Sequence, residues 1–303
     1  MGKTTVIENP VINSPFAEPV RHFRFDEDGI TNEIVTARRT SAYFIPIAQP
    51  RKRNKNQLVF DTEWTQDRLQ ENELINRIRA RVALWRKGNY PGLTRTTARL
   101  LEYWTNPERE NKLFFCQIEA LETIIYITEA ARKYGDAWID NELKNANDTA
   151  NPGLFRIAMK MATGSGKTVV MGMIIAWQVL NKLANAQDTR FSDAFLIVAP
   201  GITIRDRLRV LLPNDADNYY RQRDLVPAYN MDELGRAKIV ITNFHAFLAR
   251  EKLAAGKLTK TVLTKGTSNP FLETPAQVVR RVCRELGNKR QVIVINDEAH
   301  HCY

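Results

Sequence analysis

The sequence predicts an α/β fold in which a parallel sheet is flanked by helices and preceded by a mainly helical N-terminal region. In the second half of the chain, short apolar runs rich in β-branched residues alternate with helical patterns, which is typical of buried parallel strands. A glycine-rich turn joins one of these runs to a long apolar helix. The hydrophobic content of 44% and the charged content of 26% are those of an ordinary globular chain.

The formal charge of +10 is unevenly distributed along the chain. Residues 1–150 carry 22 basic and 21 acidic side chains, whereas residues 151–303 carry 22 basic and 13 acidic ones. A basic domain indicates a polyanionic partner such as nucleic acid. A merely solvated basic surface is the alternative interpretation.

Neither a membrane segment nor a zinc site is expected from the sequence. No apolar run approaches the roughly 18 residues of a membrane span, and the start lacks the apolar core of a secretory signal. The three cysteines, Cys116, Cys283 and Cys302, have no metal-ligand spacing, which indicates free thiols in a reducing cytosol. His300 and His301 directly precede Cys302, but adjacent side chains point in different directions and make a poor zinc site. We therefore expect a cytoplasmic protein.

Residues 1–105 are predicted to form an accessory region. Prolines interrupt its start, and one short strand is expected at 41–47, where aromatic and β-branched residues are cut short by a proline. Between residues 67 and 104, apolar residues recur at helical spacing around a break at "NYPG", which predicts a helical hairpin with Trp85 and Trp104 inside. The sequence leaves the role of this region open, and docking to another subunit is one interpretation.

Residues 106–303 are predicted to form the α/β lobe. A long helix is expected at 112–135, with Gly135 near its end, and a turn-rich linker at 145–153 follows it. Apolar β-branched runs then predict strands at 155–162, 194–200, 238–243 and 290–296. A helix at 168–183 follows the first of these strands.

The stretch "MATGSGKTVV" follows a predicted strand and opens a predicted helix, which is the context of a phosphate-binding loop. Gly164 and Gly166 permit backbone angles that a Cβ would forbid, so that several N–H groups can turn inward towards an anion. Lys167 would bridge the β and γ phosphates, and Thr168 would offer its hydroxyl to Mg²⁺. Met161 stands where the strict pattern has Gly or Ala, and an incidental glycine turn is the alternative. The predicted loop comprises Thr163, Gly164, Ser165, Gly166, Lys167 and Thr168.

A second acidic element, "VIVINDEAH", delivers Asp297 and Glu298 to the C-terminal end of an apolar strand. In open α/β sheets this edge is where ligands bind. One carboxylate can hold Mg²⁺ through water, and the next can polarise the attacking water as a general base. Together the two motifs predict the binding of a nucleoside triphosphate with Mg²⁺, which the resemblance described next implies to be ATP.

With "ATGSGKT" and "DEAH", the chain resembles the superfamily 2 helicases and translocases of the DEAD/DEAH-box type. From about residue 114 to residue 303, the sequence is similar to that of the helicase-like restriction subunit of type III restriction endonucleases. The resemblance implies a RecA-like P-loop NTPase lobe, the first of two in that family. It also implies that Gln117 reads the adenine edge, that Lys167 and Glu298 are catalytic, and that His300 couples the ATP site to neighbouring motifs.

The resemblance further implies two contacts with the backbone of one nucleic-acid strand. Backbone contacts suit a motor that steps along any sequence, because phosphates carry no base information. Arg205 and Thr242 could instead be surface or structural residues, and Gln117 could be a solvent-facing helix residue. The contact residues implied are Pro200, Gly201, Thr203, Arg205, Thr242 and Asn243.

The function expected from the resemblance is an ATP-driven DNA translocase lobe of a restriction enzyme, with a modification methyltransferase as a candidate partner subunit. An RNA helicase lobe and a nucleotide-binding regulatory module without motor activity are the alternatives. A P-loop kinase is disfavoured, because "DEAH" and the two contact blocks have no place in one. No second lobe, sheet strand or nuclease motif follows Tyr303, so we expect an N-terminal portion of a larger motor that alone turns over ATP negligibly.

Overall fold

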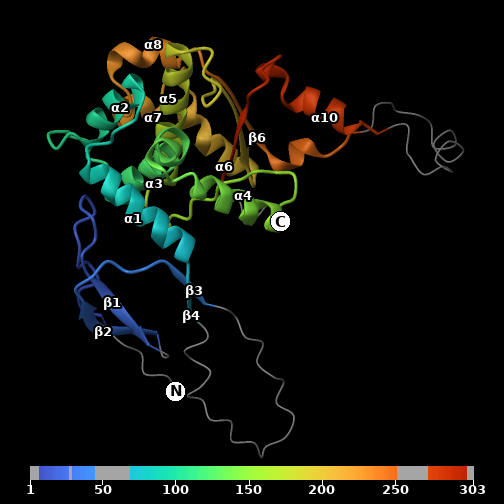
Figure 1. The fold of residues 1–303 in the computed structure, drawn as a ribbon. Helices are drawn as coiled ribbons and strands as arrows, with labels where there is room; N and C mark the ends of the chain where they lie inside the picture. The colour runs from blue at the N-terminus through green and yellow to red at the C-terminus, as the bar shows by residue number, and fades with distance from the viewer. Residues whose placement is uncertain (1–6, 27–28, 45–68, 251–271, 299–303) are drawn as a thin grey trace, which may run out of the picture. The chain divides into compact units, whose positions relative to one another are not determined.

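The computed structural model describes residues 7–26, 29–44, 69–250 and 272–298 (Figure 1). Contacts divide the chain into two compact units. The first comprises Met1–Leu93 and Lys112–Ser165, and the second comprises Thr94–Asn111 and Gly166–Tyr303. No helix in the described ranges is long and apolar enough to cross a membrane.

The first unit begins with short antiparallel strands. β1 (His22–Asp26) pairs with β2 (Gly29–Val35), and β3 (Ala42–Phe44) pairs with β4 (Leu69–Glu71). The predicted strand at 41–47 therefore corresponds to β3. β1 and β2 were not predicted, because their apolar side chains are few and Phe25, Ile30 and Ile34 stay exposed.

The helices of the first unit are α1 (Glu73–Lys87), α3 (Phe115–Ile125) and α4 (Trp138–Ala150). After α3, the helix tightens from a π turn, η3 (Tyr126–Ala130), into a 3₁₀ turn, η4 (Ala131–Tyr134). It ends at Gly135, whose φ of +77° is the left-handed conformation that glycine adopts freely. The predicted long helix and its glycine end are thus confirmed.

The predicted linker at 145–153 is wrong for its first six residues, because α4 continues to Ala150. Asn147, which is 9% exposed, stabilises this last turn. Its side-chain amide donates to the carbonyl oxygens of Leu143 and Arg156 at 2.9 Å each, and its Oδ1 accepts from the Arg156 N–H at 2.7 Å. A polar run is therefore helical here because one asparagine joins it to the segment that follows.

The predicted strand at 155–162 is also wrong: these residues form no strand. A strand needs a neighbour to take up its backbone N–H and C=O groups, and no described strand pairs with this segment. Its apolar side chains are correspondingly exposed, with Phe155 at 56%, Ile157 at 40% and Met159 at 39%.

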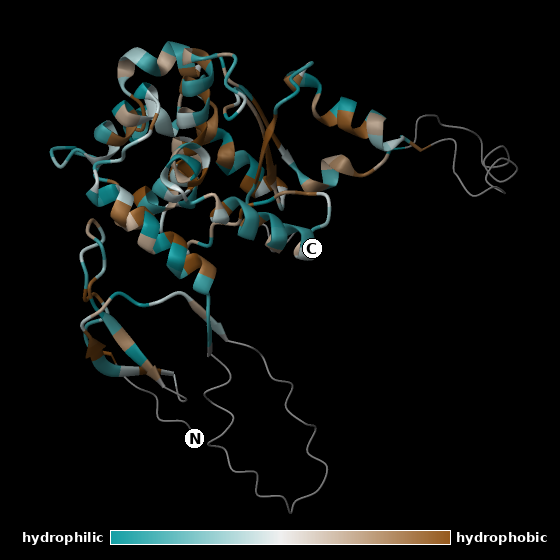
Figure 2. Cartoon of the chain, in the orientation of Figure 1, coloured by the Kyte–Doolittle hydropathy of each residue, from teal (hydrophilic) through white to brown (hydrophobic). Residues whose placement is uncertain are grey.

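The second unit contains the parallel sheet that the sequence predicts. Its strand order is β6-β5-β7, with β5 (Ala194–Ala199) in the centre, β6 (Lys238–Asn243) on one side and β7 (Ile293–Asn296) on the other. Both pairings are parallel. In Figure 2 the strands are largely brown, in keeping with the buried apolar residues of β5. The α/β class and three of the four predicted strands are thus confirmed.

Helices surround this sheet, and the longest is α5 (Lys167–Ala184), which contacts α2 (Arg95–Thr105). Trp104 of α2 is 2% exposed, and its indole N–H donates to the Leu225 carbonyl at 2.7 Å. The remaining helices are α6 (Ile202–Arg207), η5 (Leu208–Leu211), α7 (Tyr219–Gln222), η6 (Ala228–Asn230), α8 (Met231–Leu234), η7 (Phe244–Phe247), α10 (Pro275–Val282) and η8 (Arg284–Leu286).

The tryptophans of the predicted hairpin are both buried, Trp85 at 5% and Trp104 at 2%. They belong to different units, because α1 lies in the first unit and α2 in the second. The predicted domain boundary after residue 105 remains a prediction.

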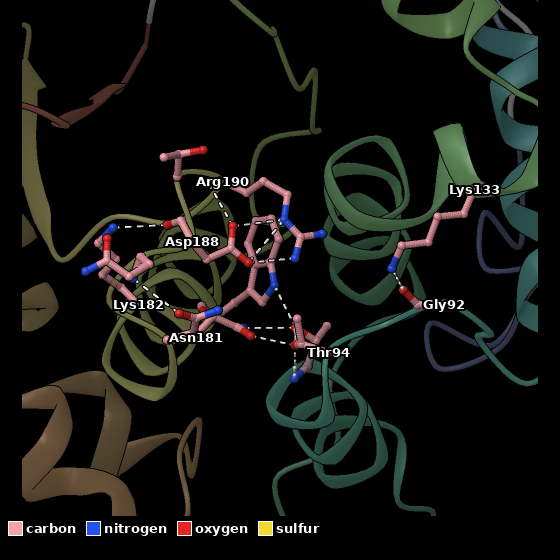
Figure 3. Close-up of polar contacts among 12 residues, drawn as sticks. Gly92, Thr94, Lys133, Asn181, Lys182, Asp188 and Arg190 are labelled. Atoms are coloured by element: carbon pink, nitrogen blue, oxygen red, sulfur yellow. Dashed lines mark hydrogen bonds and ion pairs between the residues drawn. The ribbon is translucent and has the colours of Figure 1, made fainter.

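A buried polar junction joins α2 to α5 (Figure 3). Asn181 of α5 is 3% exposed. Its Oδ1 accepts from the Thr94 hydroxyl at 2.5 Å, and its Nδ2 donates to Thr97 Oγ1 at 2.9 Å and to the Trp177 carbonyl at 2.8 Å. The Trp177 indole N–H donates to Thr97 Oγ1 at 3.1 Å. Because buried polar groups destabilise a fold unless they are paired, this junction fixes how the two helices pack.

Asn181→Ala is expected to lower the free energy of unfolding by about 1–3 kcal/mol, because it leaves buried partners with fewer hydrogen bonds. Chemical denaturation followed by circular dichroism measures the change. Gln187→Ala, in the exposed loop after α5, is the control and is expected to change stability by less than about 0.5 kcal/mol. Equal stability of the two variants would show that the junction contributes nothing.

Candidate active site

The carboxyl ends of the three parallel strands lie at one edge of the sheet. In the register, Ala199 at the end of β5 is opposite Asn243 of β6, and Val198 is opposite Asn296 of β7. The segments that follow therefore leave the sheet at this edge, which is where ligands bind in open α/β sheets. They are the predicted contact block after β5, the block after β6, and the acid pair after β7.

The glycine-rich loop adopts the backbone conformation that the sequence predicts. Gly164 has φ +78°, and Gly166, the N-cap of α5, has φ +82°. Both lie in the left-handed region, which a side chain disfavours. Among the described residues, none accepts a hydrogen bond from the N–H groups of Gly166, Lys167 or Thr168. These amides, at the positive end of α5, fit an anion.

Lys167 begins α5, and its ammonium pairs with the Glu298 carboxylate at 2.9 Å. Both side chains are about one third exposed, at 31% and 30%. Glu298 itself has φ +51°, a strained conformation for a residue with a side chain. The structure thus brings together one residue of the predicted loop and one of the predicted acid pair, although 130 positions separate them in the sequence.

Asp297 lies deeper than Glu298 and is 9% exposed. Its N–H donates to the Val198 carbonyl of β5 at 2.9 Å, which continues the sheet pairing beyond β7. Burial and the adjacent Glu298 carboxylate raise the pKa of Asp297 above its ordinary value, while the Lys167 ammonium acts in the opposite direction. A cation beside Asp297 would favour its ionised form.

The oxygen donors of the predicted loop and acid pair are of the kind that Mg²⁺ prefers. Thr168 offers a hydroxyl on the first turn of α5, and Asp297 and Glu298 offer carboxylates. Mg²⁺ prefers such oxygens and commonly keeps only one or two protein ligands, with phosphates and water completing its shell. In the part of the chain that the structure describes, no three His, Cys, Asp or Glu residues gather as a metal cluster. His300, predicted to couple the site to neighbouring motifs, lies outside the described residues.

Gln117, the predicted adenine reader, lies in the first unit at the start of α3 and is 5% exposed. Its Nε2 donates to the Ser165 carbonyl at 3.0 Å, and its Oε1 accepts from the Phe114 N–H at 2.9 Å. Ser165 in turn donates its hydroxyl to the Ala162 carbonyl at 2.6 Å, and Thr163 is exposed. The solvent-facing alternative for Gln117 is wrong, because its side chain joins α3 to the loop.

The predicted contact block after β5 lies at the sheet edge and is partly exposed. Gly201 is extended, with φ −149°, and caps α6, while Thr203 lies exposed on the first turn of α6. Pro200 and Gly201 are partly buried. Arg205 pairs with the neighbouring Asp206 at 2.7 Å on the surface, an ion pair that contributes little to stability and leaves the guanidinium within reach of solvent.

In the predicted contact block after β6, the polar side chains are engaged within the fold. Thr242 is 9% exposed, which favours the structural alternative for its side chain. Asn243 caps η7, accepting from the Ala246 N–H at 3.0 Å. Phe244 lies in the same stretch, "TNFH", but was not among the predicted contact residues; it is 50% exposed at the start of η7. The one signal in the sequence was an aromatic residue directly after the strand "KIVITN".

Comparison with known families identifies one match. Residues 97–303, well over half of the chain, match the family described as type III restriction enzyme, res subunit. No curated protein and no solved structure matches the chain.

Gly164→Ala is expected to lower the free energy of unfolding by about 1–2 kcal/mol, because its φ of +78° is left-handed. A Cβ there would meet no atom within 4 Å, so the effect is one of backbone conformation alone. Gly201→Ala is the matched control: it also has open space within 4 Å, but its φ is extended. Denaturant titration that finds the two variants equally stable would contradict a strained loop.

Proposed function

Because the chain belongs to the family of type III restriction enzyme res subunits, we propose that it contains the ATP-binding motor lobe of a DNA translocase. The family is one of superfamily 2 helicase-like ATPases. The finer proposal is a restriction subunit, which couples ATP hydrolysis to movement on DNA and works with a modification methyltransferase and an endonuclease activity.

The observation that carries this proposal is the ion pair between Lys167 and Glu298 at 2.9 Å. A lysine at the first position of a helix, beside backbone amides that have no acceptor in the described ranges, is arranged to receive a triphosphate. The carboxylate of Glu298, which follows β7 and pairs with this lysine, is arranged to take a proton from a water molecule beside that triphosphate. A structural ion pair alone would not need the two left-handed glycines that precede Lys167.

The roles of the residues follow from their chemistry. Mg²⁺, when bound, supplies charge that stabilises the oxygens of the phosphoryl group in transfer. The amides of the loop and the Lys167 ammonium orient the phosphates, and Thr168 with Asp297 holds the cation's shell. Glu298 accepts a proton from the attacking water as a general base. The alternatives, an RNA helicase lobe and a regulatory module, share these residues.

The proposed nucleic-acid contacts lie at the same sheet edge, after β5 and β6. The Gly201 amide, the Thr203 hydroxyl and the Arg205 guanidinium suit phosphate oxygens rather than bases. Comparing the binding of duplex DNA and of RNA distinguishes the first two functions. A regulatory module would bind neither.

Lys167→Ala is expected to weaken ATP binding on the order of a hundredfold, because the phosphates lose their main cation. Titration of a fluorescent ATP analogue with Mg²⁺ measures this. Lys182→Ala, near the other end of α5, removes the same charge and is expected to bind as the parent does. Unchanged affinity in Lys167→Ala would exclude the loop as the phosphate site.

Glu298→Gln is expected to bind ATP at least as tightly as the parent, because it frees Lys167 and removes a carboxylate that repels phosphate. Hydrolysis should fall about a hundredfold to ten-thousandfold with the loss of the general base. Single-turnover hydrolysis of labelled ATP by the intact motor protein, with protein in excess and duplex DNA present, measures the second effect. Hydrolysis at the parent rate would mean that another group activates the water.

A further inference from the structure

Helix α10 is held to the second unit by one face. Val278 is 6% exposed. The Arg281 guanidinium donates to the carbonyl oxygens of Ala246 at 3.0 Å and Leu248 at 3.2 Å, and to the Glu273 carboxylate at 2.8 and 2.9 Å. These bonds join α10 to η7, the turn that follows β6. They also determine which side chains of the helix face away from the unit.

The outward side chains form a basic stripe, which we define as Gln277, Arg280 and Arg284. Gln277 and Arg280 lie on α10, and Arg284 begins η8, the turn that follows α10; all three side chains are exposed. Together with Arg281 they line an open hollow of about 500 Å³. Figure 2 shows that α10 carries both teal and brown residues, as expected for a helix with one face buried and one exposed.

The charges of Arg280 and Arg284 are not neutralised within the described residues. No described carboxylate forms an ion pair with either of them, whereas Arg281 is paired with Glu273. Unpaired guanidinium groups on one face favour a polyanion, and their planar donor forks match phosphate oxygens.

The stripe begins beside the proposed nucleic-acid edge. α10 contacts η7, which carries the block after β6. On the same turn Phe244 is 50% exposed, and Leu248, just after it, is 55% exposed. A strand bound at the sheet edge after β6 would therefore meet α10 next.

We propose that the basic stripe of Gln277, Arg280 and Arg284 binds the phosphate backbone of DNA and extends the contact at η7 along α10. This inference rests on the proposed function. Arg280 on α10 and Arg284 on η8 are four residues apart in sequence and line the same hollow, so each binds a different phosphate of one backbone. Gln277 adds a neutral amide donor, and its Oε1 accepts from the Thr274 N–H at 3.0 Å at the start of α10. The contact carries no base information.

The test replaces both arginines in Arg280→Gln/Arg284→Gln, which keeps helix propensity and length. Fluorescence anisotropy with a labelled, mixed-sequence DNA duplex gives the affinity over a range of salt concentrations. Binding is expected to weaken on the order of tenfold at low salt, and the slope of log affinity against log salt to fall by about 1.8. The loss should be the same for unrelated sequences.

The charge-matched control is Arg221→Gln/Arg236→Gln, on exposed residues of α7 and of the turn after α8, two helices that contact α5. It removes the same charge and is expected to change the salt slope little. Arg280→Lys/Arg284→Lys keeps the charge and should keep most of the parent slope. Thermal unfolding of each variant checks that it folds.

An equal loss of DNA affinity in Arg280→Gln/Arg284→Gln and in Arg221→Gln/Arg236→Gln would mean that only the net charge of the protein matters, and it would overturn the inference. Parent-like affinity in Arg280→Gln/Arg284→Gln would also overturn it, yet would leave the proposed function standing if ATP binding still depends on Lys167. A parent chain that binds ATP but not DNA would overturn both the stripe and the DNA-translocase function.

Discussion

The parallel alignment of β5 with β6 and β7 is the constraint on which the second unit depends. Parallel strands bring their carboxyl ends to one edge, so segments that are far apart in the chain meet there. Gly201, Phe244 and Asp297 follow the three strands at this edge. The N–H of Asp297 still bonds to β5 at 2.9 Å, so the sheet itself positions the acid pair. A change of register would separate these groups without altering any of them.

Two sets of polar groups hold α5 at its opposite ends. At the far end, Asn181 is buried and fully engaged with α2 and its own helix. At the near end, the first amides have no acceptor among the described residues, and Lys167 pairs with Glu298. Fourteen residues, or about 21 Å of helix, separate Lys167 from Asn181. The satisfied end makes the helix rigid, and the unsatisfied end is where an anion gains most from binding.

The charged groups at the site are arranged so that a bound triphosphate and its cation can replace their present partners. In the chain by itself, Lys167 neutralises Glu298, while burial raises the pKa of Asp297. When a triphosphate and its cation bind, the phosphates would pair with Lys167 in place of Glu298. The cation would lower the pKa of Asp297 and so favour its ionised form. The surplus of basic residues in the second half of the chain suits a longer polyanion, and it includes Arg280 and Arg284, which pair with no carboxylate among the described residues.

The sequence by itself determined the elements whose cause is local. Apolar β-branched runs gave three parallel strands, and Gly164 and Gly166 adopt the positive φ expected of them, because glycine has no Cβ. Pattern alone failed where the cause lies elsewhere in the chain. Residues 155–162 have a strand's composition but no described neighbour, and residues 145–150 are helical because Asn147 bonds to Arg156. Only the tertiary structure decided that Gln117 joins the loop, that Thr242 is buried, and that α10 and η8 present arginines with no carboxylate partner among the described residues. Hydrogen-bond partners and burial depend on what packs opposite a residue, and its neighbours in sequence do not specify that.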